Sequence, residues 1–271
     1  MARSGPRFAS VRPTMSVLPV AAPQLPRNPG ASTSFRPLRA SLALPRVLLC
    51  DLDGTLIDSM PVLADIATEV LGEVYGTPPA LAREFYLATC GLPFFRQLES
   101  IFPGDARNAA ASEIFEGRKP ERCNRIRMPG DVVRTLASLQ RRGVGIVVSS
   151  NNGTDNVAAF AEAAGFPFDL ALGFGGGLAK GRPHIELCER TFGVDRSQML
   201  FVGDSLHDGE IAEREGISFV GVAGTFSYER FVLRFPEVPI VRRFAELAEL
   251  IAWPESTAAR RSEALPIAGH G

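Results

Sequence analysis

From Arg46 onward, short apolar runs alternate with amphipathic stretches that have helical spacing. Several runs are rich in β-branched residues and short enough to be strands buried on both faces. The runs are 47–50, 144–149, 170–173, 199–202 and 219–222, with a weaker one around Ile240. The stretches between them predict helices at 130–142, 154–164, 183–192, 208–215 and 244–251. This alternation predicts an α/β fold with a mostly parallel sheet.

One interval breaks the alternation, because about ninety residues separate the first two strands and a crossover needs far fewer. Helical spacing recurs inside it, at 62–71, 80–89, 93–101 and 106–116. We therefore predict a small helical cap at 62–125, inserted into an α/β core formed by 46–61 and 126–254. The segment Thr89–Pro93, between two of these helices, is compatible with an ordinary turn or with a loop that faces the substrate.

The two ends of the chain differ from the rest in composition. The first 46 residues contain seven arginines, many Pro, Ser and Ala, and no Asp or Glu. We expect residues 1–45 to be a disordered tail. The alternatives are a mitochondrial or plastid transit peptide, although its prolines disfavour an amphipathic helix, and an extended start with Met15 as initiator. The Ala/Arg/Ser-rich stretch 255–271 predicts a C-terminal tail.

Composition narrows the class of partner. The net charge of -1, with 45% hydrophobic and 22% charged residues, provides no global field toward nucleic acid or an anionic membrane. No apolar run approaches the roughly 20 residues that cross a bilayer. The four cysteines lack metal or redox spacing and suit a reducing cytosol. We expect a small-molecule partner, no nucleic acid polymer, no membrane, and a cytoplasmic protein unless residues 1–45 direct it to an organelle. The oligomeric state is open.

Polar residues follow the predicted strands, at the sheet edge where ligands bind in open parallel sheets. They come after the first, second and fourth strands, and one lysine stands between the third and fourth. These residues are Asp51, Asp53, Ser149, Lys180, Asp204 and Asp208.

These six residues suit the chemistry of phosphoryl transfer. A carboxylate such as Asp51 can attack phosphorus, but two anions repel each other, so a cation must lie between them. Oxygen ligands imply Mg²⁺, held by Asp51, Asp204 and the carbonyl of Asp53. The Asp53 side chain can act as general acid and then as general base. Lys180 and Ser149 would bind and orient the transferring oxygens.

In these motifs the chain resembles the haloacid dehalogenase superfamily of phosphohydrolases over about 46–254. Asp51–Thr55 matches the DxDGT motif, Val147–Asn151 the second motif, Lys180 the lone lysine, and Gly203–Asp208 the GDxxxD motif. The resemblance implies a Rossmann-like parallel sheet with helices on both faces, phosphoaspartate chemistry, and a helical cap as in phosphoglycolate-phosphatase-like members. It also implies that Asp208 supports the metal site or Lys180.

Other functions stay open at this point. A phosphosugar mutase uses the same phosphoaspartate but returns the phosphate to a sugar. A dehalogenase does not require the acid/base and metal groups present here. A binding protein on this fold could lose Asp51, Asp53 or Asp204, and the chain keeps all three. The substrate is open among phosphoglycolate, sugar phosphates and nucleotide monophosphates.

Two further features have ordinary explanations. His184 and His207 lack an identifiable nucleophile and orienting acid, so surface or capping roles are favoured. The glycine-rich stretch Gly173–Lys180 fails the Walker A pattern, because Ala179 stands where glycine should precede the lysine. It is interpreted as a flexible turn that brings Lys180 to the sheet edge.

Overall fold

The computed structural model describes residues 42–123 and 125–251. The predicted tails and the transit-peptide alternative lie outside the described residues, apart from residues 42–45. There the Leu42 N–H donates to the Leu250 carbonyl at 2.8 Å, and Leu42 forms a bridge with Ile251. The described structure therefore includes four residues, 42–45, before the predicted start of the core.

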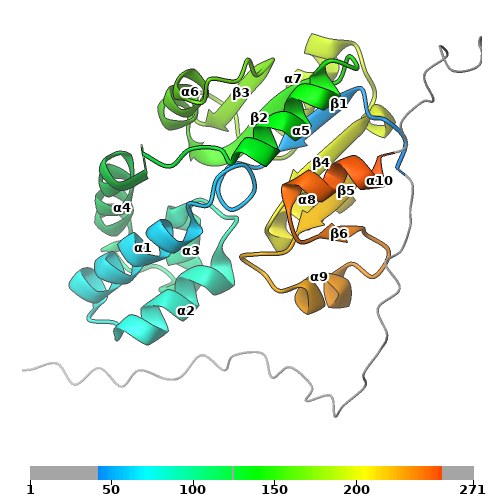
Figure 1. The fold of residues 1–271 in the computed structure, drawn as a ribbon. Helices are drawn as coiled ribbons and strands as arrows, with labels where there is room; N and C mark the ends of the chain where they lie inside the picture. Colours follow the sequence, from blue (N-terminus) through cyan, green and yellow to red (C-terminus); the bar gives the residue numbers. More distant parts are fainter. Residues whose placement is uncertain (1–41, 124, 252–271) are drawn as a thin grey trace, which may run out of the picture. The chain divides into compact units, whose positions relative to one another are not determined.

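Six parallel strands form one sheet in the order β3-β2-β1-β4-β5-β6 (Figure 1). The strands are β1 Val47–Cys50, β2 Gly145–Gly153, β3 Leu170–Phe174, β4 Met199–Gly203, β5 Ser218–Val222 and β6 Ile240–Val241. Every predicted strand is present, which confirms the α/β prediction. β1 lies between β2 and β4, so its carboxyl end is the point where the strand order reverses and where ligands bind in such sheets.

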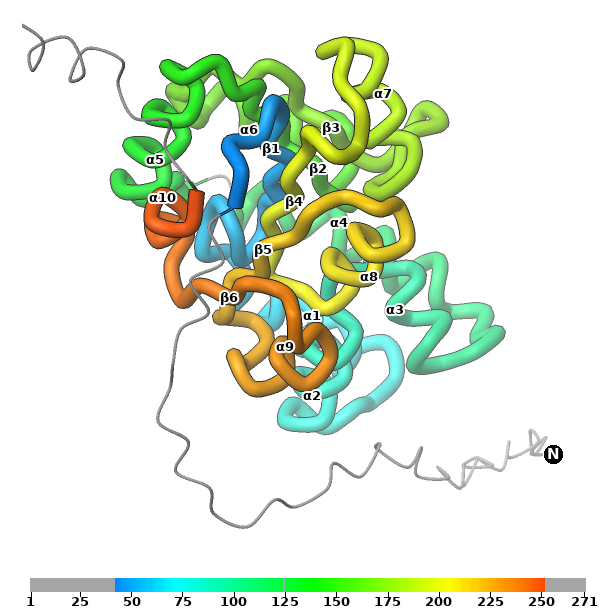
Figure 2. Tube along the Cα trace, turned by 90° about the vertical axis from the view of Figure 1, so that its right-hand side faces the viewer, coloured from blue at the N-terminus to red at the C-terminus, as the bar shows by residue number. Residues whose placement is uncertain are grey.

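Helices cover both faces of the sheet. Those outside the insertion are α5 Gly130–Gln140, α6 Thr154–Ala163, α7 Arg182–Phe192, α8 Leu206–Glu215, α9 Tyr228–Arg234 and α10 Leu247–Leu250, with 3₁₀ turns η1 Arg196–Gln198 and η2 Phe244–Glu246. One hydrophobic cluster joins Leu48 and Cys50 of β1 to residues of α5, α6 and α10. The other joins Val47 and Leu49 to α7, α8 and α9. Figure 2 shows α5 and α10 on one side of the strands and α7 and α8 on the other.

The inserted helices, α1–α4, lie between β1 and α5 in the chain. They are α1 Met60–Tyr75, α2 Pro79–Thr89, α3 Phe94–Ile101 and α4 Asn108–Cys123. They have a hydrophobic cluster of their own, in which Phe94 of α3 stacks on Phe115 of α4 with ring centroids 3.9 Å apart. Aromatic burial of this kind contributes to holding the inserted helices together.

Several helices differ in extent from the sequence prediction, and α4 and α9 differ most. Helix α4 continues through Pro120 to Cys123, past the predicted end at Glu116, because Phe115 and Lys119 are both buried one turn apart and keep this face packed. Helix α9 was not predicted, since its seven residues are too few to show helical periodicity; it begins after Ser227 and buries Phe231. Within the described residues, no helix is long and apolar enough to span a membrane.

Candidate active site

The turn after β1 places two carboxylates at the reversal point of the sheet. The Asp51 N–H continues the ladder to the Val202 carbonyl at 2.9 Å, and the Gly54 N–H closes the turn onto the Ile57 carbonyl at 2.8 Å. Gly54 has φ +83°, and a Cβ there would collide with the Asp204 carboxylate. Only glycine fits this position, since it alone combines a positive φ with so close an approach. The glycine of the DLDGT sequence is therefore a structural requirement of the site.

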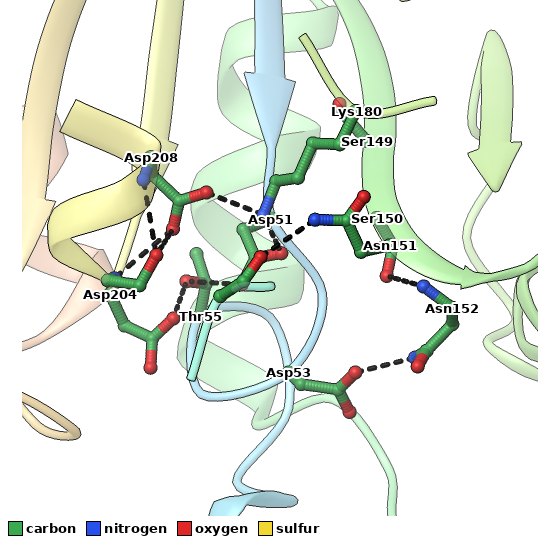
Figure 3. A network of polar contacts seen from close by, with 12 residues as sticks. Asp51, Asp53, Thr55, Ser149, Ser150, Asn151, Asn152, Lys180, Asp204 and Asp208 are labelled. Carbon is green, nitrogen blue, oxygen red and sulfur yellow. Dashed lines mark hydrogen bonds and ion pairs between the residues drawn. The ribbon is translucent and has the colours of Figure 1, made fainter. Parts of the chain in front are cut away.

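Lys180 forms the centre of a buried ion cluster (Figure 3). Its Nζ lies 2.5 Å from Asp51 Oδ1 and 2.5 Å from Asp208 Oδ1. Burial disfavours the charged lysine, but the two carboxylates outweigh it and raise the pKa of Lys180. Asp208 uses its other oxygen to accept hydrogen bonds from the Ser205 backbone N–H and hydroxyl, which cap α8. Asp208 therefore fixes the lysine, and the lysine fixes Asp51.

Asp204, at the end of β4, faces Asp51 from the neighbouring strand. Thr55 Oγ1 lies 3.4 Å from both Asp51 Oδ2 and Asp204 Oδ1, and the Thr225 hydroxyl donates to Asp204 Oδ2. Burial and the charges of Asp51 and Asp208 raise the pKa of Asp204 well above its usual range. Burial raises the pKa of Asp51 to about 6, although Lys180 opposes the shift. Burial is the largest cause of both shifts, and the neighbouring carboxylates add to them.

The donor set fits a divalent cation. Oxygen atoms of Asp51, Asp204 and Asp208 lie within 4.8 Å of one another, and all three side chains are buried. Three carboxylates against one lysine leave an excess of negative charge at hard oxygen donors, which is the environment that Mg²⁺ prefers. Asp208 is occupied by Lys180 and the Ser205 cap, whereas Thr55 Oγ1 lies 3.4 Å from one oxygen of Asp51 and one of Asp204, so these two carboxylates face each other across the turn. The geometry fits the predicted pair of ligands.

Ser149 does not lie where a residue that orients the transferring oxygens would have to be. Its hydroxyl is 2.9 Å from His184 Nδ1, while His184 Nε2 donates to the Gly173 carbonyl at 3.1 Å. The ring can donate only through Nε2, so the serine hydroxyl donates to Nδ1. Burial lowers the pKa of His184 to about 4, and the histidine is neutral. Ser149 and His184 thus join β2 to β3 behind the site, and neither lines the active-site pocket.

The active-site pocket is the cavity of about 60 Å³ between the sheet edge and the inserted helices. From the sheet side it is lined by Asp51, Asp53, Lys180, Asp204, Ser205 and the stretch 150–152. From the inserted side it is lined by Met60, Leu63, Tyr86, residues 90–94, Gln97, Phe115, Glu116 and Lys119. The segment Thr89–Pro93 therefore contributes four of its five residues to the pocket wall.

Two asparagines near the carboxyl end of β2 contact the inserted segment. Asn151 Nδ2 donates to the Gly91 carbonyl at 2.7 Å. Asn152 Nδ2 donates to Asp53 Oδ2 at 2.5 Å, and its Oδ1 accepts a short hydrogen bond from Lys119 Nζ. Asp53 Oδ1 accepts a second hydrogen bond from the Ser59 hydroxyl, at 2.5 Å. Both oxygens of Asp53 thus have protein donors, and Figure 3 shows the carboxylate pointing toward Asn152. Asp53 lines the pocket.

Sequence reasoning missed several residues of this pocket. Ser150, Asn151 and Asn152 line it, and their signal was the run of four polar residues that ends β2, of which only Ser149 was selected. Thr225 follows β5 at the same sheet edge and was available by the same logic. Lys119 has no sequence signal, because it occurs in an amphipathic helix among other charged residues.

Comparison with known proteins adds independent findings. Residues 48–222 match the family described as haloacid dehalogenase-like hydrolase. A phosphoglycolate phosphatase of Pectobacterium atrosepticum is 32% identical over 231 residues, which cover 80% of this chain and 97% of that protein. The protein named "Probable phosphatase IndB" of Dickeya dadantii is 30% identical over 214 residues, 74% of this chain and 91% of its own. The structure of a haloacid dehalogenase-like family hydrolase from Streptococcus pneumoniae has a TM-score of 0.63 at 19% identity and covers 74% of this chain and 96% of its own.

Proposed function

This chain belongs to the haloacid dehalogenase-like hydrolase family and is a phosphatase of that family; on this premise we propose that it hydrolyses a small phosphomonoester through a phosphoaspartate at Asp51. The observation that carries the proposal is the Lys180 cluster, which fixes the Asp51 carboxylate in the pocket between Asp53 and Asp204. A fixed carboxylate beside a second, separately held carboxylate is the arrangement that covalent transfer with acid/base assistance requires.

The reaction proceeds in two displacements. One Asp51 oxygen attacks phosphorus and forms an O–P bond, while the bond from phosphorus to the leaving oxygen breaks and Asp53 gives that oxygen a proton. Asp53 then removes a proton from water, which attacks phosphorus. The bond to Asp51 breaks, and inorganic phosphate leaves with Asp51 restored.

Charge and orientation come from the groups around Asp51. Asp51, Asp204 and the Asp53 carbonyl would hold Mg²⁺, which supplies positive charge to offset the repulsion between phosphate and carboxylate. Lys180 offers its ammonium to the transferring oxygens. Ser150, which lines the pocket, takes the orienting role that the sequence suggested for Ser149.

The substrate is a compact phosphorylated metabolite, and phosphoglycolate is the first candidate. The pocket of about 60 Å³ favours a small leaving group, and the Pectobacterium relative carries the name phosphoglycolate phosphatase. We propose that α1–α4 act as a cap over the sheet edge, since their side chains complete the pocket.

The test is phosphate release by purified protein across a panel of phosphomonoesters that includes phosphoglycolate, with and without Mg²⁺. Release that requires Mg²⁺ and is lost in Asp51→Asn is the expected result. An isomerised product without free phosphate would transfer the proposal to a phosphosugar mutase. Release that Asp51→Asn retains would overturn the role of Asp51.

A further inference from the structure

Three polar side chains separate the active-site pocket from a second cavity. That cavity has a volume of about 210 Å³ and is lined mostly by apolar residues, including Leu52, Ile57, Met128 and Phe160. Asp53, Lys119 and Asn152 line both spaces. They form a hydrogen-bonded partition that runs from α4 to the turn after β1.

Asn152 lies between Lys119 and Asp53, and its two neighbours allow only one orientation of its side-chain amide. Lysine can only donate hydrogen bonds, and an ionised carboxylate can only accept them. An amide between them must present its oxygen to the lysine and its nitrogen to the carboxylate, as Asn152 does. Lys119 therefore selects the amide orientation in which Asn152 donates to Asp53.

Burial and close contacts hold the Lys119 ammonium in place, and this fixes the orientation of the Asn152 amide. Its residue is 6% exposed, and its Nζ lies 3.0 Å from Glu116 Oε2 and 5.4 Å from the centre of the Phe115 ring. A buried ammonium keeps its acceptors, because an unpaired one is costly. Its nearest carboxylate, Glu116, leaves the local charge balanced, so this lysine is poorly suited to attract the anionic end of a substrate.

One oxygen of Asp53 accepts from Ser59, next to the start of the insertion, and the other accepts from Asn152 of β2, which Lys119 near the end of the insertion orients. Ser59 immediately precedes α1, whereas Lys119 lies on α4 and acts through Asn152. We propose that Lys119 and Asn152 are positioning residues that hold the Asp53 carboxylate in its working orientation when α4 is seated. The inference rests on the proposed function, which gives Asp53 its acid/base role.

The test compares Lys119→Met with Arg118→Met, a matched control. Arg118 is the preceding residue of α4, and it pairs with Glu73 at the surface of the inserted helices. Lys119→Met is expected to lower kcat about 10- to 100-fold with KM within about 3-fold, because misplacement of a reacting group by about 1 Å can cost 10²-fold. Arg118→Met and the conservative Lys119→Arg should retain kcat within about 3-fold of wild type.

The decisive arm repeats Lys119→Met and Asn152→Ala in an Asp53→Ala background. If both residues act through Asp53, neither should lower the residual kcat by more than about 2-fold there. Equal losses in both backgrounds would overturn the proposal. A rise in KM at constant kcat would also overturn it and would make Lys119 a substrate ligand.

Folding and function are checked separately. Thermal unfolding of Lys119→Met identifies a variant that fails to fold, in which case Asn152→Ala, on the sheet side, decides the same question. A wild-type protein that releases phosphate from no compound would defeat the proposed function itself. An active wild type whose variants lose kcat independently of Asp53 would defeat only the positioning role.

Discussion

The two walls of the active-site pocket differ in chemistry. The sheet edge presents Asp51, Asp204 and Lys180, all buried, with Lys180 paired to Asp51 and Asp204 facing Asp51 from the next strand. The inserted side presents mainly Phe94, Phe115 and other apolar groups, which belong to the hydrophobic cluster of the inserted helices. Under the proposed function, the sheet wall holds the groups that transfer the phosphoryl group, and the inserted wall contacts what is attached to it. Apart from Lys119, we therefore expect reaction and selectivity to depend on separate parts of the chain.

The largest expected effect follows from changing the sheet wall at Asp204. Asp204→Asn should lower phosphate release by about 10²–10³-fold, because a metal contributes several kcal/mol to stabilising the transition state. The same change removes a buried charge whose pKa is raised by burial and by Asp51, so the metal-free variant should unfold at the same or a higher temperature than wild type. Thermal unfolding with and without Mg²⁺ provides the check. Stabilisation of the variant by Mg²⁺ equal to that of wild type would contradict the assignment.

A smaller effect is expected where the two walls meet at Gly91. This residue has φ +94°, and a Cβ would lie 2.5 Å from Ser205 Oγ. Gly91→Ala should raise KM about 10-fold, because the loop 89–93 must withdraw from the sheet edge. Gly104→Ala is the matched control, since Gly104 also has a positive φ, +69°, but open space around it. Steady-state kinetics of the two variants should differ; equal KM values would show that the contact at Gly91 does not matter.

Changing the inserted wall alone should alter selectivity. Phe115→Leu thins the stack with Phe94 and should change the ratio of kcat/KM between a small and a larger substrate by up to about 10-fold, the usual range for a change in an apolar pocket. Phe102→Leu disturbs a similar stack, on Tyr75 with centroids 4.0 Å apart, that does not line the pocket. Only Phe115→Leu should shift the ratio. A shift of the same size in both variants would show that cap stability, rather than pocket shape, controls selectivity.

The smallest effect concerns His184, behind the sheet wall. The pKa of this buried histidine is lowered to about 4, below its usual value of 6.5, so the folded state binds fewer protons than the unfolded state between these values. The stability that the neutral ring contributes is present above pH 6.5 and is lost as pH falls toward 4, by up to about 3 kcal/mol. The His184→Gln variant has no titrating ring at this position, so its free energy of unfolding should fall less than that of wild type as the pH is lowered. Chemical denaturation of both proteins at pH 7 and pH 5 measures it, and parallel losses would refute the assignment.

The same division explains how much of the molecule its sequence could predict. The strands and the residues Asp51, Lys180 and Asp204 were predictable, because strand periodicity and strand-end motifs are local features and a parallel sheet brings its strand ends together. The choice between Ser149 and Ser150 could not be predicted, because it depends on which of the two side chains points to the pocket near the end of β2. Lys119 was beyond reach as well, since it meets Asn152 only through the packing of helices far apart in sequence.

The central claim is that Asp51 becomes phosphorylated during turnover, and trapping that acyl phosphate tests it most directly. Protein mixed with substrate and Mg²⁺ is quenched in acid within milliseconds, reduced with borohydride, digested and sequenced by mass spectrometry. The account predicts homoserine in place of aspartate at position 51, and at no position in an Asp51→Asn control. Reduction at another aspartate, or none at position 51 in protein that is releasing phosphate, would contradict it.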